Sequence, residues 1–245
     1  MPQKLIVSLV PSLTELLFAL GAGDTLVGRT RFCTEPEGAV EAVPIVGGTK
    51  NPRVERIIGI RPTLVLANRE ENRREDVEAL RAAGLDVLLT DPNSVPEAVA
   101  MILEVGVQLG AEVRAQALAR EIVAELRVPL RAPPVRAFAA VWWNPLMGLG
   151  SQSYGHDLLE RAGFANVLAA QPRYPELTLI ALRDLHPDLI LLPDEPFPFT
   201  ASHAPEFEEI APVKFIDGKL LWWYGPRLPE ALRTFRDLAA QAATW

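Results

Sequence analysis

Two stretches of this chain repeat one apolar pattern, and that repeat constrains the fold more than any other feature. Each stretch predicts a short helix, a proline turn and a buried strand. The matched positions share one offset and are Val54, Ile57, Ile60, Pro62, Leu64 and Leu66 with Leu179, Leu182, Leu185, Pro187, Leu189 and Leu191. Leu16-Leu17 and Gly21 match Leu158-Leu159 and Gly163 at a slightly larger offset. Strands that alternate with helices predict parallel sheets. We therefore expect two Rossmann-like α/β lobes of like topology, with chance similarity of βα units as the alternative.

A long helix is predicted near the middle of the chain, over residues 111–127. Its apolar residues recur at the spacing of one helix face, and charged residues fill the other side. Pro129 and then Pro133-Pro134 end it, because proline has no N–H to continue the helix. We interpret this helix as a rigid bridge (111–132) between an N-terminal lobe (1–110) and a C-terminal lobe (133–245). The alternative is one surface helix of a single α/β domain.

Two local expectations concern segments beside the predicted strands. The run Ser12-Leu13-Thr14-Glu15 has the composition of a capping box, in which serine and glutamate side chains satisfy backbone N–H groups at a helix start. A helix over residues 13–20 should follow it. The aromatic run from Leu220 to Tyr224 is predicted to be extended.

Charge and cysteine usage exclude several classes of protein. The net charge of -7 argues against a nucleic-acid or anionic-membrane partner, which would favour a basic face. The single cysteine, Cys33, excludes an internal disulfide. No apolar run is long enough to insert into a bilayer, and Ser8, Pro11 and Ser12 interrupt the apolar core that an export signal needs. A cytoplasmic location is therefore expected, or a periplasmic or cell-surface one if a leader has been removed.

Aromatic residues gather where the predicted strands of the second half end. They are Trp142, Trp143, Tyr154, Tyr174, Phe197, Phe199, Trp222, Trp223 and Tyr224. Loops at the carboxyl ends of parallel strands line the ligand crevice of α/β proteins, and aromatic faces suit a large, flat, partly apolar ligand. The alternative is that individual rings belong to the core. Strand alternation predicts that only one of two adjacent tryptophans faces a ligand.

Metal and enzyme signatures are weak. His156, His186 and His203 lie far apart in sequence, and no spacing predicts a zinc site. No dinucleotide fingerprint, phosphate-binding loop or nucleophile elbow is present. Asp194 and Glu195 follow a strand, where catalytic acids often lie, but ordinary solvated charge is the simpler interpretation.

Several runs resemble one known family over nearly the whole chain. The opening from Ser8 to Gly21 carries the most specific resemblance, and the segment from Glu55 to Ala67 is also typical. His156-Asp157-Leu158-Leu159 and Pro187-Asp188-Leu189-Ile190 add looser matches in the second half. These runs resemble the helical-backbone metal receptors, the class III substrate-binding proteins that serve ABC importers of cobalamin, haem and iron–siderophores. The cobalamin-binding branch is the most similar.

The resemblance implies two Rossmann-like lobes joined by one long helix, with the ligand held between them. The implied ligand contacts, carried over by position, are Pro11, Ser12, Asn68, Arg69, Trp142, Trp143, Tyr154, Trp222, Trp223 and Tyr224. Phe32, Phe197 and Arg227 are added as aromatic and cationic loop candidates. Asn68 departs from the tryptophan that cobalamin binders can carry at this place. Arg74 lies near the first of two glutamates through which the family docks its permease, with Glu71 and Glu75 beside it, and Glu230 is the nearest acid to the second.

The sequence thus predicts a non-enzymatic substrate-binding protein that holds a corrinoid, foremost cobalamin, for ABC-type uptake. No intrinsic cofactor, bound metal, nucleic acid or membrane insertion is expected, and an ABC permease is a possible partner. The alternatives are a haem or ferric-siderophore binding protein of the same family, and a corrinoid-handling protein or enzyme that uses Asp194, Glu195 or His156. An interaction module that exposes Trp222 and Trp223 is a third.

Overall fold

The computed structural model describes residues 4–244, and the chain divides into two compact units. Unit 1 holds the residues up to Asp91 together with Val99–Arg120 and Tyr224–Pro226. Unit 2 holds Pro92–Ala98, Glu121–Trp223 and the residues from Arg227 onward. The mid-chain helix α5 (Glu112–Leu126) contributes residues to both units. The ranges 1–110, 111–132 and 133–245 stay a prediction about the folding domains.

Unit 1 is built on a four-stranded parallel sheet in the order β2-β1-β3-β4. Its strands are β1 (Ile6–Ser8), β2 (Leu26–Arg29), β3 (Leu64–Asn68) and β4 (Val87–Thr90). Its helices are α1 (Pro11–Ala19), the short 3-10 helix η1 (Gly23–Thr25), α2 (Val54–Ile60), α3 (Arg74–Ala82) and α4 (Val95–Leu109), whose first turn belongs to unit 2.

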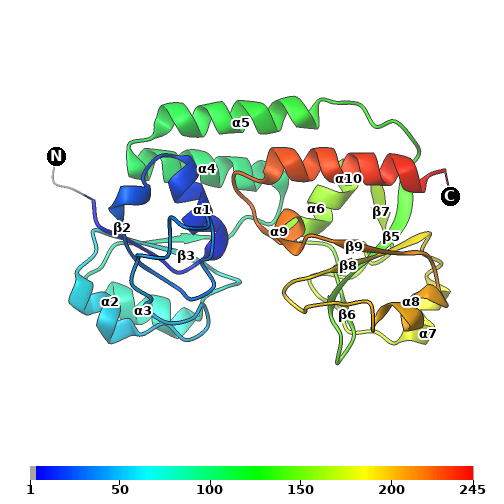
Figure 1. The fold of residues 1–245 in the computed structure, drawn as a ribbon, viewed down its shortest axis with the longest axis horizontal. Coiled ribbons are helices and arrows are strands. Elements are labelled where there is room, and N and C mark those ends of the chain that lie inside the picture. The colour runs from blue at the N-terminus through cyan, green and yellow to red at the C-terminus, as the bar shows by residue number, and fades with distance from the viewer. Residues whose placement is uncertain (1–3, 245) are drawn as a thin grey trace. The chain divides into compact units, whose positions relative to one another are not determined.

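The strand order explains where the helices of unit 1 lie. The chain moves one way from β1 to β2 and the other way from β2 to β3 and β4. Since crossovers between parallel strands are right-handed, α1 must cover one face of the sheet and α2 and α3 the other. Figure 1 shows this division, with α4 on the same side as α1. Every residue of β1 and β3 is buried, as expected for a strand that is covered on both faces.

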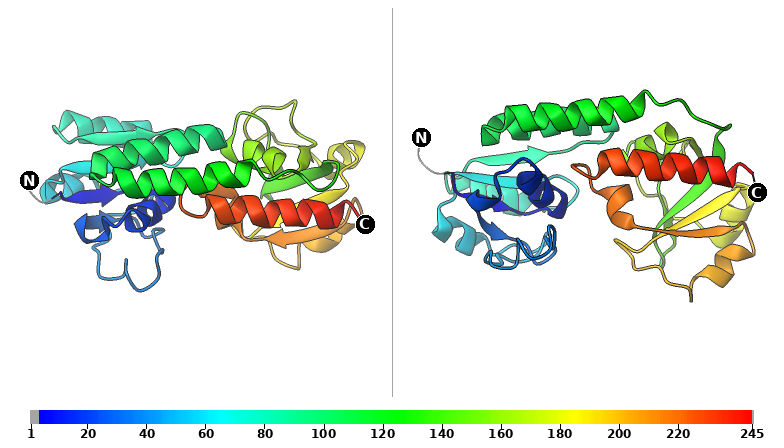
Figure 2. Two further views of the ribbon diagram at one scale, coloured as in Figure 1. Left: turned by 90° about the horizontal axis from the view of Figure 1, so that it is seen from above. Right: turned by 45° about the horizontal axis from the view of Figure 1, so that its top comes forward.

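Unit 2 repeats this plan with one added strand. Its strands are β5 (Val135–Trp142), β6 (Met147–Gly148), β7 (Phe164–Asn166), β8 (Leu189–Pro193) and β9 (Val213–Ile216). Its helices are α6 (Tyr154–Arg161), α7 (Leu179–Asp184), α8 (Ala204–Glu208), α9 (Gly218–Trp222) and α10 (Leu228–Ala242). The parallel strands run β7-β5-β8-β9, and only β6 pairs antiparallel, with β5. In Figures 1 and 2, α6, α9 and α10 lie together on one face of this sheet.

The predicted fold class, two parallel-sheet α/β lobes of like topology, is confirmed. The order β2-β1-β3-β4 in unit 1 corresponds to β7-β5-β8-β9 in unit 2. The first sequence repeat falls on α2–β3 and α7–β8, and the second falls on α1 and α6. The repeat was therefore a signal of topology, because equivalent positions in the two sheets need the same buried apolar residues.

Two local predictions are wrong. The capping box does not form, because α1 begins at Pro11 and Val10 is its N-cap. Proline suits the first helical position, since its fixed φ is helical and its missing N–H is not needed there. Of the segment predicted to be extended, Leu220 to Trp222 lies in helix α9, which the side chain of Asp217 caps by accepting a hydrogen bond from the Lys219 N–H, while Trp223 has an extended backbone. Strands β6 and β7 and helix α8 were not predicted at all.

Unit 2 has a well-defined apolar core beneath the sheet face that carries α7 and α8. It is centred on Phe138 and Phe207, both fully buried, together with Ile190 and Leu192 of β8. The rings of Phe138 and Phe207 stack with their centroids 6.5 Å apart. This core matters for function because aromatic side chains at the ends of β5 and β8 continue it toward the surface. Within residues 4–244, no helix is both long and apolar enough to cross a bilayer.

Candidate functional site

Each sheet has a switch point, where the chain reverses the direction in which it adds strands. In unit 1 this point lies between β1 and β3, and in unit 2 between β5 and β8. Ligands of open α/β sheets bind outside the carboxyl ends of the strands at such points. The residues that follow these four strands are therefore the first candidates, and each unit is considered by itself.

In unit 1 the switch point is closed by a network of buried side-chain amides. The side chain of Asn72 donates to the carbonyls of Leu9 (3.3 Å) and Thr49 (2.9 Å) and accepts from the N–H of Asn68 (2.9 Å). The Asn68 amide donates to the carbonyl (3.1 Å) and hydroxyl (3.2 Å) of Thr90. Its oxygen accepts from the N–H groups of Glu70 (2.8 Å) and Glu71 (3.2 Å).

Hydroxyl groups extend this network along the same edge. Thr14 donates to Ser8 at 2.8 Å, and Thr90 donates to the Ala67 carbonyl at 3.0 Å. The buried phenol of Tyr224 interacts with the side chains of Ser12 and Thr90, and burial raises the pKa of Tyr224 well above its ordinary value. We call Ser8, Asn68, Asn72 and Thr90 the polar edge. Its amide groups satisfy backbone groups, so the polar edge is a rigid frame.

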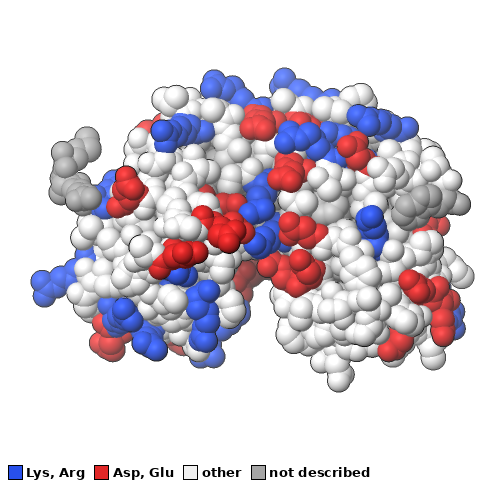
Figure 3. Space-filling model, in the orientation of Figure 1, with Lys and Arg blue, Asp and Glu red and all other residues white. Residues whose placement is uncertain are grey.

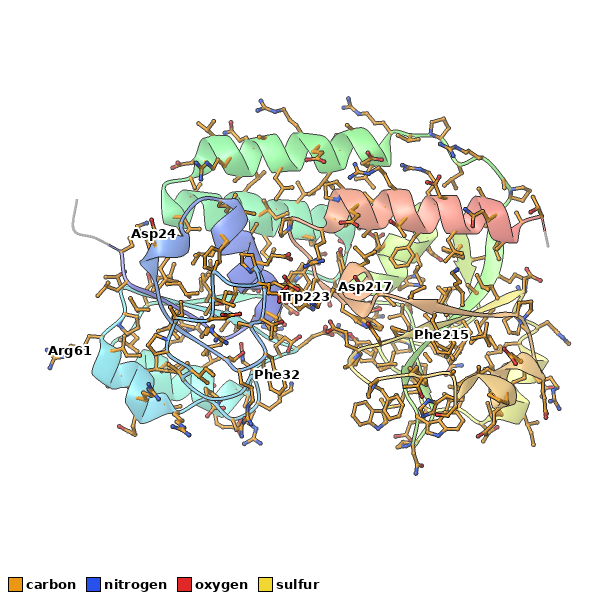
Figure 4. The ribbon with its side chains drawn as sticks, in the orientation of Figure 1. Asp24, Phe32, Arg61, Phe215, Asp217 and Trp223 are labelled. Carbon is orange, nitrogen blue, oxygen red and sulfur yellow. The ribbon has the colours of Figure 1, made fainter. Side chains whose placement is uncertain are left out.

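The loops around the polar edge carry charge and one exposed ring. Phe32, labelled in Figure 4, is 53% exposed after β2, with the Arg31 guanidinium 5.6 Å from its centroid. Arg69 forms an ion pair with Asp91 at 3.2 Å. Burial raises the pKa of the Glu71 carboxyl, an effect that the nearby Lys50 ammonium opposes. Figure 3 shows Lys and Arg grouped on the lower part of unit 1.

In unit 2 the switch point is occupied by rings. Trp142 ends β5, is 40% exposed, and meets Phe197 edge to face with centroids 5.3 Å apart. Phe197 lies against Phe199 (4.8 Å) and His203 (5.3 Å). Trp143 packs on His203 (5.8 Å) and on the core ring of Phe207 (5.3 Å). We call Trp142, Trp143, Phe197, Phe199 and His203 the aromatic edge. In Figure 3 the lower part of unit 2 is mostly white, with charged side chains at its right-hand side.

The imidazole of His203 sits among these rings in a defined orientation. Its Nδ1 accepts a hydrogen bond from the Thr200 N–H at 3.1 Å. A neutral imidazole that accepts at Nδ1 carries its proton on Nε2. The Thr200 carbonyl oxygen lies 3.3 Å from the same Nδ1, so the other tautomer, with its proton on Nδ1, also has a hydrogen-bond partner.

A second aromatic group lies at the end of α9. The indole N–H of Trp222 donates to the Glu195 carbonyl at 2.6 Å, and that of Trp223 donates to the Glu195 carboxylate at 2.7 Å. Trp223, labelled in Figure 4, has the Lys219 ammonium 5.4 Å and the Arg227 guanidinium 5.5 Å from its ring. Cations at this distance over an indole are attracted by its ring quadrupole.

The predicted contact residues fall into two groups. Exposed or half-buried positions belong to Pro11, Phe32, Arg69, Trp142, Trp143, Phe197, Trp222 and Arg227. Buried positions belong to Ser12, Asn68, Tyr154, Trp223 and Tyr224. Tyr154 begins α6, and burial raises its pKa strongly. Trp142 and Trp222 are the more exposed members of their pairs, but strand alternation is not the reason, because Trp143 follows β5 and Trp222 lies in helix α9.

The residues considered for metal or acid–base chemistry have structural partners. His156 contacts the Asn166 amide through Nδ1 at 2.9 Å and lies 3.6 Å from Glu160. Cys33 is fully buried, and burial raises its thiol pKa. Asp194 accepts a hydrogen bond from the Gly218 N–H at 2.8 Å. Within residues 4–244, no three His, Cys, Asp or Glu side chains gather as metal ligands would.

Sequence reasoning missed three parts of this geometry: Asn72, Glu195 and the place of His203. Asn72 stands in a charged run that predicts a solvated helix face, and only its position four residues after Asn68 hints at a local hydrogen bond. Glu195 was interpreted as solvated charge, yet it is the acceptor for two indoles. Tryptophan donors elsewhere in the chain were the available signal, because a buried indole N–H needs an acceptor.

Comparison with known proteins adds evidence of a different kind. The sequence model of the family described as periplasmic binding protein matches residues 6–195. This chain belongs to the periplasmic binding protein family. The expectation of a cytoplasmic location is therefore wrong: it rested on the absence of an export signal, whereas the family and the relatives below are periplasmic. The resemblance to the class III substrate-binding proteins that was inferred from the sequence is confirmed.

Relatives of this periplasmic binding protein are named as vitamin B12-binding or heme-binding proteins. The Vitamin B12-binding protein of Yersinia pestis (strain Pestoides F) is 35% identical over 92 residues, a match that covers 38% of this chain and 32% of that protein. This chain thus matches about a third of the length of its curated relative. All the relatives described here are named as binding proteins, in line with the prediction of a chain that is not an enzyme.

Solved structures match over their whole length. The periplasmic vitamin B12 binding protein BtuF of Vibrio cholerae has a TM-score of 0.84 at 19% identity and covers 100% of this chain and 99% of its own. The periplasmic heme-binding protein BhuT, in complex with two hemes, has a TM-score of 0.84 at 26% identity, with 98% and 99% covered. The heme-binding protein RhuT from Roseiflexus sp. RS-1 has a TM-score of 0.81 at 23% identity, with 98% and 99% covered.

Proposed function

We propose that this periplasmic binding protein holds a corrinoid of the cobalamin type, and that the aromatic edge of unit 2 is its ring-binding surface. One observation carries the proposal: Trp142 and Phe197 present partly exposed rings at the switch point of the unit 2 sheet. A flat ligand of mixed polarity gains most from burial against such rings. Aromatic contacts add about 0.5–1.5 kcal/mol per pair beyond the area that they bury.

The charges that follow the strands of unit 2 favour a ligand with neutral side groups. Asp194, Glu195 and Asp217 bring acid to these loops, and Lys219 and Arg227 are engaged over the Trp223 ring. A corrin ring carries mostly neutral amides, whereas haem carries propionates and catecholate siderophores are strongly anionic. Anionic chelates need cations that face them, because an unpaired charge is costly to desolvate. These unit 2 loops carry three acids and two cations, so they offer no excess of positive charge to an anionic chelate, which favours the corrinoid at this edge.

The need for an axial ligand from the protein distinguishes haem from a corrinoid. Protein-bound haem usually takes an axial ligand from a His, Tyr, Met or Cys side chain. His203 is the imidazole of the aromatic edge, and its Nδ1 lies 3.1 Å from the Thr200 backbone nitrogen and 3.3 Å from the Thr200 carbonyl oxygen. A cobalamin supplies its own axial ligands and asks for no such side chain. Haem is the second candidate, because BhuT, at 26% identity, is a heme-binding protein.

Delivery to an ABC permease is the role that follows for a member of this family. The acidic docking residues considered from the sequence, Glu71, Glu75 and Glu230, remain predictions. Of these, Glu75 and Glu230 are exposed in the first turns of α3 and α10, while Glu71 is half-buried. An exposed carboxylate is the better candidate for a docking contact, since a buried one must first be uncovered.

The test is a titration of the purified chain with cyanocobalamin, haemin and a ferric catecholate in separate experiments, followed by tryptophan fluorescence and calorimetry. We expect saturable binding of cyanocobalamin, weakened in Trp142→Ala. Phe215→Ala is the matched control, because Phe215 is 41% exposed in β9 and Trp142 is 40% exposed in β5. Both variants lose a comparably exposed ring from a strand of the same sheet.

The outcomes separate the candidates. Binding of haemin with a Soret shift and no binding of cyanocobalamin would transfer the assignment to haem. Equal losses in Trp142→Ala and Phe215→Ala would remove the aromatic edge from the site while leaving the ligand assignment standing. Absence of saturable binding to all three chelates would end the proposal.

A further inference from the structure

Glu195 is the shared acceptor of two neighbouring indoles. Its backbone carbonyl accepts from Trp222 Nε1 at 2.6 Å, and its side-chain Oε1 accepts from Trp223 Nε1 at 2.7 Å. Indole has a single N–H and no acceptor, so one hydrogen bond satisfies it completely and fixes the direction of the ring. Two rings of α9 are thereby oriented by one residue of the loop after β8.

The loop and the helix are also fitted together through their backbones. Asp194 accepts from the Gly218 N–H at 2.8 Å, at the first residue of α9. A Cβ at Gly218 would stand 2.8 Å from the Glu195 carbonyl oxygen and 3.0 Å from its nitrogen. No side chain fits at that distance from backbone atoms, so residue 218 has to be glycine for this close approach.

Glu195 connects the α9 indoles to the aromatic edge along the chain. Phe197 lies two residues further on, and its ring contacts Trp142, Phe199 and His203. The Glu195 side chain is partly buried, and Asp194, Asp217 and Lys219 are the charged groups that act on it. Burial of a carboxylate is costly unless it accepts hydrogen bonds, and the Trp223 indole supplies one.

We propose that Glu195 is a positioning residue for ligand binding: it orients Trp222 and Trp223 and holds the segment that carries Phe197, without contact to the ligand itself. This inference rests on the proposed function, because it assigns how the aromatic surface of that site is kept in place. The Glu195 side chain acts directly on Trp223, whereas half-exposed Trp222 bonds to the Glu195 backbone carbonyl and is affected by the side chain only through the α9 segment that both indoles share.

The experiment compares Glu195→Ala with Glu195→Gln in the full-length chain. Glu195→Ala removes the acceptor of Trp223, whereas glutamine keeps an amide oxygen at that place without the charge. We expect Glu195→Ala to weaken cyanocobalamin binding by about tenfold, which is the effect of roughly 1.4 kcal/mol. Glu195→Gln should restore affinity to within about threefold of the parent chain. Glu206→Ala, an exposed acid of α8, is the matched control and should bind as the parent does.

Near-ultraviolet circular dichroism of the unliganded variants provides a readout that does not depend on binding. Fixed indoles give structured signals, so Glu195→Ala should lose tryptophan fine structure and Glu195→Gln should keep it. A double-mutant cycle with Trp223→Phe completes the test. Phenylalanine has no N–H to donate, so Glu195→Ala should cost less affinity in that background than in the parent.

The inference is overturned if glutamine is as harmful as alanine, since charge rather than orientation would then matter, or if Glu195→Ala leaves both dichroism and affinity unchanged. If the parent chain binds no chelate, the proposed function fails. The dichroism of the unliganded variants then still decides whether Glu195 orients the indoles. A thermal melt of each variant shows that a loss of binding comes from folded protein.

Discussion

The polar edge of unit 1 and the aromatic edge of unit 2 occupy the same place in one topology, yet they carry opposite chemistry. At the switch point of unit 1, Asn68 and Asn72 bond to backbone groups of three neighbouring segments. At the switch point of unit 2, Trp142 and Phe197 meet edge to face and remain partly exposed. The side chains of the first edge hold their own loops in place, whereas the second edge leaves part of its ring surface exposed.

This difference indicates which positions can determine ligand specificity in a protein with two lobes of like topology. Equivalent strand ends supply equivalent positions, but function belongs to the side chains placed there rather than to the fold. A side chain whose hydrogen bonds are all made within the protein contributes stability and geometry. A ring with exposed area can still gain free energy by burial. Each of the following substitutions alters one of the two edges and leaves the other intact.

The largest effect is expected from Asn72→Ala at the polar edge. The substitution removes a donor from the carbonyls of Leu9 and Thr49 and an acceptor from the Asn68 N–H, all at buried residues. Buried polar groups that lose their partners cost about 1–3 kcal/mol each, and we expect a total loss of about 3 kcal/mol in the free energy of unfolding. Urea unfolding measures it.

The control for Asn72→Ala is Asn51→Ala, which truncates an exposed asparagine in the neighbouring loop. It should stay within about 0.5 kcal/mol of the parent. If the two variants unfold at the same urea concentration, the amide network is not what stabilises the polar edge. Ligand affinity of folded Asn72→Ala should change less than its stability does.

The converse is expected for Trp142→Ala at the aromatic edge. Its ring is 40% exposed in the free protein, so truncation should cost less stability than it would in the core. Loss of one ligand-facing ring should weaken cyanocobalamin binding by about 1–2 kcal/mol, or roughly tenfold to thirtyfold. Calorimetry measures this change. A large loss of stability with unchanged affinity would make Trp142 a packing residue and erase the contrast between the edges.

A smaller effect is expected from Thr90→Val, which keeps the shape of the side chain at the end of β4. The hydroxyl donates to the Ala67 carbonyl and accepts from the Asn68 amide. Its replacement by a methyl group should lower the free energy of unfolding by about 1 kcal/mol. Thr34→Val, at an exposed threonine, is the control and should be near neutral in the same melt. Equal stability of Thr90→Val and Thr34→Val would mean that the Asn68 amide holds β4 in place without the Thr90 hydroxyl.

Much of the fold could be predicted from the sequence because buried positions repeat. Matched apolar residues predict the α2–β3 and α7–β8 segments. Gly110 and the prolines after residue 128 mark the limits of the mid-chain helix. The short helices α8 and α9 escaped prediction. Each is five residues long, too short for a periodic pattern, and α9 depends on the Asp217 cap.

The residue types of the candidate site could be predicted from the sequence, but the structural role of each residue could not. Aromatic residues after β5 and β8 were evident, and they do form one cluster with His203. Whether a polar residue faces solvent or its own backbone depends on partners distant in sequence. Asn72 bonds to a carbonyl 63 residues away, and no local pattern encodes such a contact. Glu71 shows the same limit, since it stands in a run of charges that predicts a solvated helix face.

The smallest effect on stability is expected from Glu71→Gln. Its sign shows whether burial of the carboxyl or its attraction to Lys50 dominates. Burial raises the folded-state pKa of Glu71 above its ordinary value of 4.5, although Lys50 opposes the shift. A raised pKa means that folding favours the protonated acid. The resulting stabilisation of the folded state is fully present below the unfolded-state pKa and is lost as the pH rises through the folded-state pKa.

Glutamine is neutral throughout, so Glu71→Gln should melt slightly higher than the parent near about pH 7, with the difference closing toward about pH 4. Calorimetric melts at the two pH values measure it, and Glu75→Gln, at an exposed acid of α3, should leave both melts unchanged. A lower melt for Glu71→Gln at neutral pH would show that attraction to Lys50 outweighs burial. A stabilising ion pair would then lie beside the polar edge, which would widen the contrast with the uncharged rings of unit 2.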